Sequence, residues 1–299
     1  MTDRSAAGPY AAHELLVAPA RSRPEIWRLL LGFVLIAMIV FGLNTALRVA
    51  VTALASPEWA KDLGAGRRPG TTLLLLGSFG FLTLATMVVA HLLQWRAPLS
   101  LIGPPARALV QFWRVLRLLA LLGLAMLLLP PYDLGAPLIP NLSPGPWLLL
   151  LPVSLLAVLI QTSAEEILFR GYLQQTLAAR FAHPAVWLVV PALLFALGHF
   201  NPDQAGANAG LIVIWAGVFG VLMADLTARA GSLGPAIAVH FFNNITALLI
   251  TASPESLNGL SLFLLPFPMD GTGLARGWLT VDFALIPICW LVARIAIRR

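Results

Sequence analysis

Two adjacent carboxylates and an arginine interrupt a long apolar stretch in the middle of the chain. The sequence around them reads Ala-Glu-Glu-Ile-Leu-Phe-Arg-Gly-Tyr from Ala164 to Tyr172, and residues 147–163 contain no charge. A carboxylate at the centre of a bilayer costs roughly 2.5 to 3.5 kcal/mol on insertion scales, so ionisable groups at such depth indicate a functional site. The other apolar segments are therefore searched for side chains that could meet these carboxylates.

The spacing of the three charged residues predicts one ion pair and one carboxylate without a partner. Glu166 and Arg170 are four residues apart with the acid on the N-terminal side, so on a helix they can form an ion pair. Glu165 lies about 100° further around the helix and faces elsewhere. A structural ion pair beside a solvated carboxylate would account equally well for these three residues alone. Polar residues on other helices are needed to decide between this structural role and an active site.

Two further apolar segments carry such residues. One ends Phe195-Ala-Leu-Gly-His199, and in an antiparallel helical hairpin turning near residues 182–184 His199 would lie at the same depth as Glu165. The other contains His240 and Asn244, whose spacing of four places them on one helix face. Two carboxylates, two histidines and an amide on three apolar helices predict an active site.

These motifs, in this order, resemble those of the CPBP family, the CAAX proteases and bacteriocin-processing enzymes also called the Abi family. The resemblance rests on Glu-Glu-x-x-x-Arg, Phe-x-x-x-His and His-x-x-x-Asn with their flanking residues and covers roughly residues 147–252. It implies an intramembrane endopeptidase similar to the type II CAAX prenyl endopeptidases, which remove the last three residues of prenylated CAAX proteins. It further implies that Phe195 is a wall of the site and that the catalytic residues are Glu165, Glu166, Arg170, His199, His240 and Asn244.

The implied residues allow two mechanisms of peptide hydrolysis, which needs an activated water, a stabilised oxyanion and a proton for the leaving amine. In the first mechanism Glu165 and His199 deprotonate water, while His240 and Asn244 donate to the oxyanion. In the second, zinc is bound by Glu165, His199 and His240, and the remaining acid is the base. The chain lacks a His-Glu-x-x-His segment, and asparagine is a better oxyanion donor than zinc ligand. Both mechanisms stay open, so zinc is a candidate cofactor and a metalloprotease a candidate class.

The composition predicts an all-α polytopic membrane protein. Of the 299 residues 59% are hydrophobic and only 11% are charged, whereas a soluble domain has about 25% charged residues. The net charge of +6 comes almost entirely from arginine, because Lys61 is the only lysine. In such a protein basic residues report topology, so no nucleic-acid binding is expected. The single cysteine, Cys289, excludes a disulfide within the chain.

About eight apolar segments are long enough to be transmembrane helices, and the fourth, fifth and seventh would form the active-site bundle. We expect a cytoplasmic N-terminal tail at 1–24, variable transmembrane helices at 25–146, a protease core at 147–252, and a loop with a last helix at 253–299. The eight segments are approximately 26–47, 71–93, 112–130, 147–170, 185–200, 209–228, 234–252 and 278–297.

The positions of the basic residues predict the orientation in the membrane. Arginines precede the first segment, separate the second from the third, follow the fourth and end the chain, so both termini are expected in the cytoplasm and the protein in the cell membrane. The basic loop around Lys61 conflicts with this orientation. Asp225 and Arg229, four residues apart, predict an interfacial ion pair. Asp282, early in the last segment, has only Arg276 as a nearby basic residue, and the sequence offers no account of it.

A transporter, or a non-catalytic binding or immunity protein, could use the same polar cluster. Transporters commonly show two related halves with broken helices in corresponding positions, whereas here the polar residues lie in one half only, which favours the enzyme. The expected partners are the lipid bilayer and a peptide or membrane-protein substrate. A prenylated C-terminus is one candidate substrate, and the sequence does not select among the candidates.

Overall fold

The computed structural model describes residues 8–128 and 136–298, without the side chain of residue 127. The first seven residues of the expected tail and the last two of the third expected segment, 129–130, lie outside this range. So do the loop residues 131–135 and Arg299.

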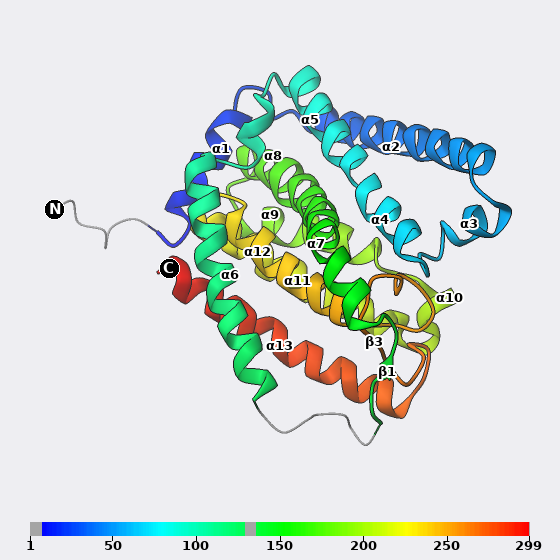
Figure 1. The fold of residues 1–299 in the computed structure, drawn as a ribbon. Helices are drawn as coiled ribbons and strands as arrows, with labels where there is room; N and C mark the ends of the chain where they lie inside the picture. Colours follow the sequence, from blue (N-terminus) through cyan, green and yellow to red (C-terminus); the bar gives the residue numbers. More distant parts are fainter. Residues whose placement is uncertain (1–7, 129–135, 299) are drawn as a thin grey trace.

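The described chain is mostly helical with almost no strand, which confirms the predicted all-α polytopic membrane fold (Figure 1). Six helical stretches in the described residues are long and apolar enough to cross a membrane, and two shorter apolar helices accompany them. The six are α2 (Ile26–Leu54), α4 with α5 (Pro69–Ser78 and Gly80–Gln94), α6 (Pro105–Leu127), α7 with α8 (Pro144–Glu166 and Gln174–Arg180), α10 with α11 (Pro202–Ala205 and Ala209–Ala230) and α13 (Gly273–Ile297). The shorter helices are α9 (Pro184–Leu197) and α12 (Gly234–Ile245) with its continuation.

Proline fixes the start of several helices. Pro69, Pro105, Pro144 and Pro184 each occupy the first position of their helix. The missing N–H of proline costs nothing there, because the first N–H groups of a helix have no partner within it. The prolines that mark breaks between apolar segments in the sequence are therefore the first residues of helices.

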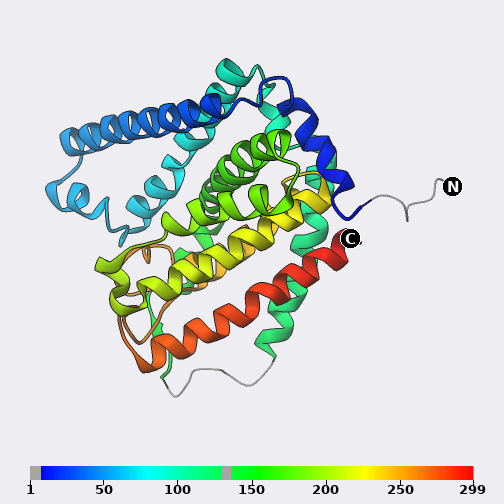
Figure 2. The ribbon, with the colours of Figure 1, turned by 180° about the vertical axis from the view of Figure 1, so that it is seen from behind.

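The helix α7 lies within the bundle and carries the two adjacent carboxylates near its end (Figure 1). It packs against α12, α4 and α5, while α12 also packs against α6. Seen from behind, α11 lies between α9 and α13 (Figure 2), in agreement with the contacts α11 makes to both. The two carboxylates, Phe195 and His240 thus come from helices that share one interior.

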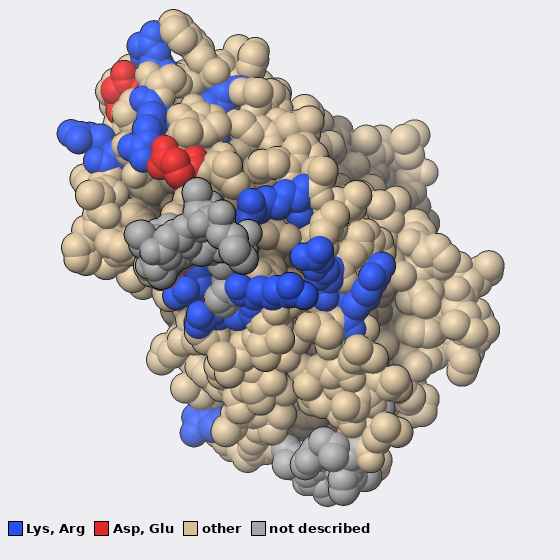
Figure 3. All heavy atoms as spheres, turned by 90° about the vertical axis from the view of Figure 1, so that its left-hand side faces the viewer, with Lys and Arg blue, Asp and Glu red and all other residues tan. Residues whose placement is uncertain are grey.

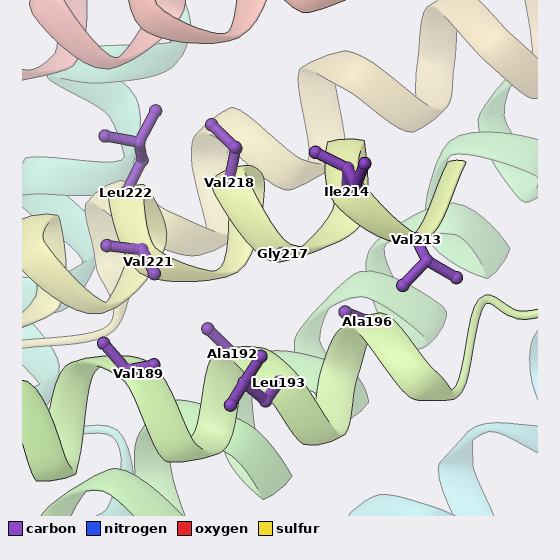
Figure 4. Close-up of a pocket in the computed structure, with 10 residues that line it drawn as sticks. All are labelled: Val189, Ala192, Leu193, Ala196, Val213, Ile214, Gly217, Val218, Val221 and Leu222. Carbon is purple, nitrogen blue, oxygen red and sulfur yellow. The ribbon is translucent and has the colours of Figure 1, made fainter. Parts of the chain in front are cut away.

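Small residues bring α9 and α11 close together. A Cβ on Gly220 would lie 2.8 Å from the Cβ of Ala192, and one on Gly217 would lie 3.7 Å from that of Ala196. Close backbone approach through small residues is a common way for membrane helices to pack. Along this contact runs a wholly apolar groove of about 450 Å³, lined from both helices by side chains such as Leu193 and Val218 (Figure 4). The close contact fixes the position of α9, which carries Phe195 and leads to His199.

The expected N-terminal tail is not free where it is described. Short helical turns, η1 (Ala11–His13), α1 (Glu14–Val17) and η2 (Ala18–Ala20), dock on α8 and α11. Leu16, Val17 and Ala20 are buried, and the ring of His13 lies 4.7 Å from that of Trp187. The segment is therefore part of the packed fold.

Both ends of the described chain lie on the same side of the molecule (Figure 1), where arginine side chains gather (Figure 3). The predicted pair of Asp225 and Arg229 is confirmed there, with 2.8 Å between Oδ1 and Nε. Tyr10 and Trp290 also donate hydrogen bonds to Asp225, at 2.8 and 3.0 Å. Lys61 lies in α3 (Pro57–Asp62), at the end of the molecule away from the termini, so the conflict posed by this basic loop persists.

A small three-stranded sheet lies at the end of the molecule away from the termini. Its order is β1-β3-β2, with β1 (Ile139–Pro140) antiparallel and β2 (Thr251–Ala252) parallel to β3 (Phe263–Leu264). The sheet joins the segment before α7 to the segments that follow α12. It thereby ties together the ends of the two helices that carry most of the polar residues.

Candidate active site

The Glu166–Arg170 ion pair predicted from the spacing of four is confirmed. Arg170 Nη1 lies 3.0 Å from Glu166 Oε1, and the two side chains are 1% and 0% exposed. Arg170 also donates to the carbonyl oxygen of Gly220 on α11, at 3.2 Å. Removing one partner of such a buried pair would leave an uncompensated charge. Because Arg170 also bonds the Gly220 carbonyl, the pair connects the helix that carries the carboxylates to α11.

The helix that carries these residues changes its winding immediately after Glu166. Residues Ile167–Leu173 form a π-helical stretch between α7 and α8. Within it the Gly171 carbonyl accepts a hydrogen bond from the buried Arg96, and a Cβ at this glycine would lie 3.1 Å from the Leu101 carbonyl oxygen. A second π-helical stretch, Thr246–Ile250, follows α12 directly. Such stretches occur frequently at functional sites, and here each begins within two residues of a predicted site residue.

His240 bridges the two carboxylates. Its Nδ1 lies 2.9 Å from Glu166 Oε1 and its Nε2 lies 3.5 Å from Glu165 Oε2. Because an ionised carboxylate only accepts hydrogen bonds, the N–H at Nδ1 donates to Glu166 and leaves Nε2 toward Glu165. The side chains from the fourth and seventh predicted segments therefore meet.

A chain of three side-chain amides ends at Glu165, and its central member, Gln161, was not among the residues predicted from the sequence. Asn244 Nδ2 donates to Gln161 Oε1, and Gln161 Nε2 donates to Glu165 Oε1, both at 2.7 Å. Asn243 Nδ2 donates to Asn244 Oδ1 at 3.2 Å. A signal was present, because Gln161 is a polar residue four positions before Glu165 in a run without charge and so shares its helix face.

His199 lies next to this network without joining it. Its Nδ1 lies 2.8 Å from the Phe195 carbonyl oxygen, which can only accept, so Nδ1 carries the proton and Nε2 is left as an acceptor. In the described parts of the chain it makes no hydrogen bond or ion pair with either carboxylate. Its ring lies 4.4 Å from that of Phe195, which in turn lies 6.0 Å from His240. Five of the six predicted residues are thus connected, with His199 across one aromatic ring.

Aromatic rings form one wall of the site. Phe195 is 2% exposed and lies under the Arg170 guanidinium, 4.8 Å from its central carbon. Phe219 lies 5.1 Å from the ring of His240, and Trp215 stacks on Phe219 at 5.5 Å. These rings keep water from the inner carboxylate, Glu166. Electrostatic interactions are stronger in such surroundings than in water.

The three side chains of the zinc mechanism are not arranged as a ligand set. His199 makes no hydrogen bond or ion pair with Glu165, and the Nδ1 of His240 binds Glu166. In residues 8–128 and 136–298 no group of three histidine, cysteine or acidic side chains is placed to hold a metal ion. A two-His-one-acid site needs all three donors within bonding distance of one point.

Two carboxylate oxygens of the site, Glu165 Oε2 and Glu166 Oε2, have no hydrogen-bond partner among the described residues, and they differ in burial. Glu165 Oε1 accepts from Gln161, whereas Oε2 has no hydrogen-bond partner among the described residues. The Glu165 side chain is 13% exposed, against 0% for Glu166. A buried acceptor without a partner is costly unless something binds to it. Glu165 Oε2 is therefore the atom at which a water molecule or substrate group can be held.

The fold and the polar cluster define a multi-pass membrane protein with a buried acid, imidazole and amide site. Residues 146–246 match the family model described as type II CAAX prenyl endopeptidase Rce1-like. This part of the chain, which holds all six predicted residues, is similar to the Rce1-like family, and the resemblance to the CPBP family is confirmed.

A relative in Bacillus subtilis (strain 168), described as "Uncharacterized protein YyaK", is 33% identical over 115 residues. The match covers 37% of this chain and 37% of the relative, so it spans little more than a third of either protein. No solved structure matches the chain.

Proposed function

We propose that the protein is an intramembrane endopeptidase that hydrolyses a peptide bond with a water molecule activated by Glu165. The observation that carries this proposal is the unpartnered Glu165 Oε2, which lies 3.5 Å from His240 Nε2 while Gln161 holds the other oxygen. The match of residues 146–246 to the type II CAAX prenyl endopeptidase Rce1-like family supports the same activity.

Glu165 is the general base in this proposal and His199 is the second contact to the water. Glu165 takes a proton from water at Oε2, and the hydroxide attacks the substrate carbonyl carbon. Nε2 of His199 is an acceptor, because Nδ1 donates to the Phe195 carbonyl. The proton on Glu165 then passes to the leaving amine as the C–N bond breaks. The acid returns to its ionised state, so the cycle balances.

His240 and Asn244 stabilise the oxyanion in this proposal. Asn244 donates one amide hydrogen to Gln161, so its second amide hydrogen is available to the substrate. Nε2 of His240 supplies the other hydrogen bond when the ring is protonated. The charges of Glu165, Glu166, Arg170 and His240 then sum to zero, which avoids a net charge in an apolar interior. Donors already aimed at developing charge are a major source of catalysis.

The substrate in this proposal is a peptide segment of a membrane protein. A prenylated C-terminus is one candidate, in keeping with the name of the matched family. We further propose that the protein lies in the cell membrane with the arginine-rich face and both termini in the cytoplasm (Figure 3).

The test combines one substitution with one chelator. Wild type, Glu165→Gln and the exposed control Glu58→Gln are reconstituted in proteoliposomes with fluorogenic membrane peptides. We expect Glu165→Gln to lose at least about 1000-fold in kcat/KM, since the general base is removed, while Glu58→Gln and chelator-treated wild type keep their activity. Activity in Glu165→Gln would refute the role of the carboxylate. Loss of activity with chelator and recovery with zinc would support the metal-dependent mechanism instead.

A further inference from the structure

A second cavity lies beside the candidate active site. It has a volume of about 270 Å³ and lies between the early turns of α11 and α13 and the segment that follows Asn243. Asn243 lines the cavity and donates to Asn244, and Trp215 lines it and stacks on Phe219, which contacts His240. The cavity and the site thus share two walls.

Among the residues that the structure describes, Asp282 is the only charged one that lines this cavity. It lies within the membrane-spanning helix α13 and is half-buried. In the described residues its carboxylate has no hydrogen-bond or ion-pair partner. Arg276, the nearest basic residue in the sequence, instead donates to Asn208 at 3.1 Å. A membrane carboxylate without a partner indicates a binding function, and its natural ligand is a positive charge.

The other walls favour an organic cation. The indoles of Trp215 and Trp278 line the cavity together with Met269, and apolar atoms make up most of its surface. A cation held over an indole face gains cation–π attraction, and the effect is larger when water is excluded. A calcium or magnesium ion would need several oxygen ligands, whereas here one carboxylate faces mostly apolar walls. The ligand should therefore carry its charge at the end of an apolar stem.

We propose that this cavity is a subsite for a lysine or arginine side chain of the substrate, with its charge at Asp282 and its stem against Trp215 and Trp278. The proposal rests on the proposed endopeptidase activity. The volume of about 270 Å³ equals about nine times the ~30 Å³ that a water molecule occupies in the liquid, so an extended basic side chain fits.

The shared walls limit where in the substrate the basic residue lies. Asn243 is the residue next to Asn244, which we assign to the oxyanion. Residues in an extended peptide are about 3.3 to 3.6 Å apart. The basic residue is therefore within a few positions of the bond that is cleaved.

Binding is tested without cleavage, on the full-length Glu165→Gln variant in detergent. The probe is n-butylguanidinium, its neutral isostere n-butylurea is the comparison, and affinity is measured by calorimetry. We expect n-butylurea to bind at least about 10-fold more weakly, and Asp282→Asn to weaken n-butylguanidinium by the same factor. The exposed control Asp203→Asn should change nothing. Equal binding of the two probes, or no effect of Asp282→Asn, would overturn the subsite.

A second pair of measurements covers the case in which Asp282→Asn does not fold. Trp278→Phe leaves the carboxylate in place and should weaken n-butylguanidinium by about 3-fold, with n-butylurea unchanged, because it replaces the stronger cation–π partner. A loss of both probes in equal proportion would indicate collapse of the cavity and overturn the assignment to a cation.

Cleavage kinetics separate this proposal from the proposed function. Peptides that differ only by lysine or norleucine at each position around the cleaved bond are compared with wild type and Asp282→Asn. We expect one position at which lysine is preferred at least about 10-fold in kcat/KM, mainly through KM, with the preference lost in Asp282→Asn. Cleavage that ignores the change would overturn the subsite and leave the endopeptidase standing. Probe binding at Asp282 without cleavage of any peptide would overturn the endopeptidase and, with it, the assignment of the ligand as a substrate side chain.

Discussion

Replacing Gln161 by leucine should reduce catalysis without unfolding the protein. The substitution keeps the approximate size of the side chain and removes two hydrogen bonds of 2.7 Å, one to the Glu165 carboxylate and one from Asn244. A hydrogen bond to a charged group contributes about 1.5 to 3 kcal/mol and a neutral one about 0.5 to 1.5 kcal/mol. Together they amount to about 2 to 4.5 kcal/mol, which corresponds to about 30- to 2000-fold if the whole effect falls on the transition state.

The assay measures kcat and KM separately in proteoliposomes, beside thermal unfolding in detergent. In the proposed mechanism Gln161 orients the base and the oxyanion donor and does not touch the substrate, so kcat should fall while KM changes little. The control is Gln204→Leu, the same chemical change at an exposed position in α10. A kcat within about 3-fold of the control, or a fall in activity fully matched by a fall in stability, would refute the positioning role of Gln161.

Three further predictions concern the parts of the fold that hold the site. Arg170→Met should destabilise the protein by about 3 to 5 kcal/mol because it leaves Glu166 buried and unpaired, and adding Glu166→Gln should restore part of the loss in a denaturant titration. Burial lowers the pKa of His13 from 6.5 to about 4, so the docked N-terminal segment excludes a proton that the released segment binds. Docking should be fully stable above about pH 6.5 and weaken by up to roughly 3 kcal/mol as the pH falls to 4. Proteolysis of the N-terminal segment at different pH values would detect this weakening, and His13→Phe should abolish the pH dependence. Gly220→Val should separate α9 from α11 and lower activity at least about 10-fold, whereas Gly210→Val, whose Cβ meets nothing within 4 Å, should not.

Periodicity and charge spacing predicted the features that depend on one helix at a time. The apolar segments became helices, and Glu166 with Arg170 paired at the expected spacing. These predictions need only the geometry of a helix and the cost of burying a charge. Local rules were sufficient because both partners lie on the same element.

Features that depend on two elements were harder to predict. The antiparallel hairpin was expected to bring Glu165 and His199 to the same depth, but equal depth does not fix the direction of a side chain around its helix. The π-helical stretch Ile167–Leu173 changes that direction by altering the winding just after Glu166. His199 in turn bonds its own helix at the Phe195 carbonyl. No periodic pattern in the sequence reports either event.

Gln161 was not predicted because the role of a side-chain amide depends on its hydrogen-bond partners. A search for groups that titrate finds carboxylates and histidines, while a glutamine in an apolar helix is consistent with simple packing. Its role follows from the two hydrogen bonds that join α7 to α12. Such bonds become visible only when the facing helix is placed.

The pairing of charges explains why Glu165 and Asp282 are the residues left for function. The structure gives Glu166 two partners, Arg170 and His240, and gives Asp225 three, Arg229, Tyr10 and Trp290. Both of these acids pair with an arginine, which stabilises the fold, although Glu166 Oε2 makes no hydrogen bond among the described residues. An acid in a membrane helix that has no arginine or lysine partner carries an unfavourable free energy that only a bound water, proton or cation can offset. The free oxygen of one such acid faces an imidazole and the other faces an apolar cavity with two indoles, so the first is suited to activating water and the second to holding an organic cation.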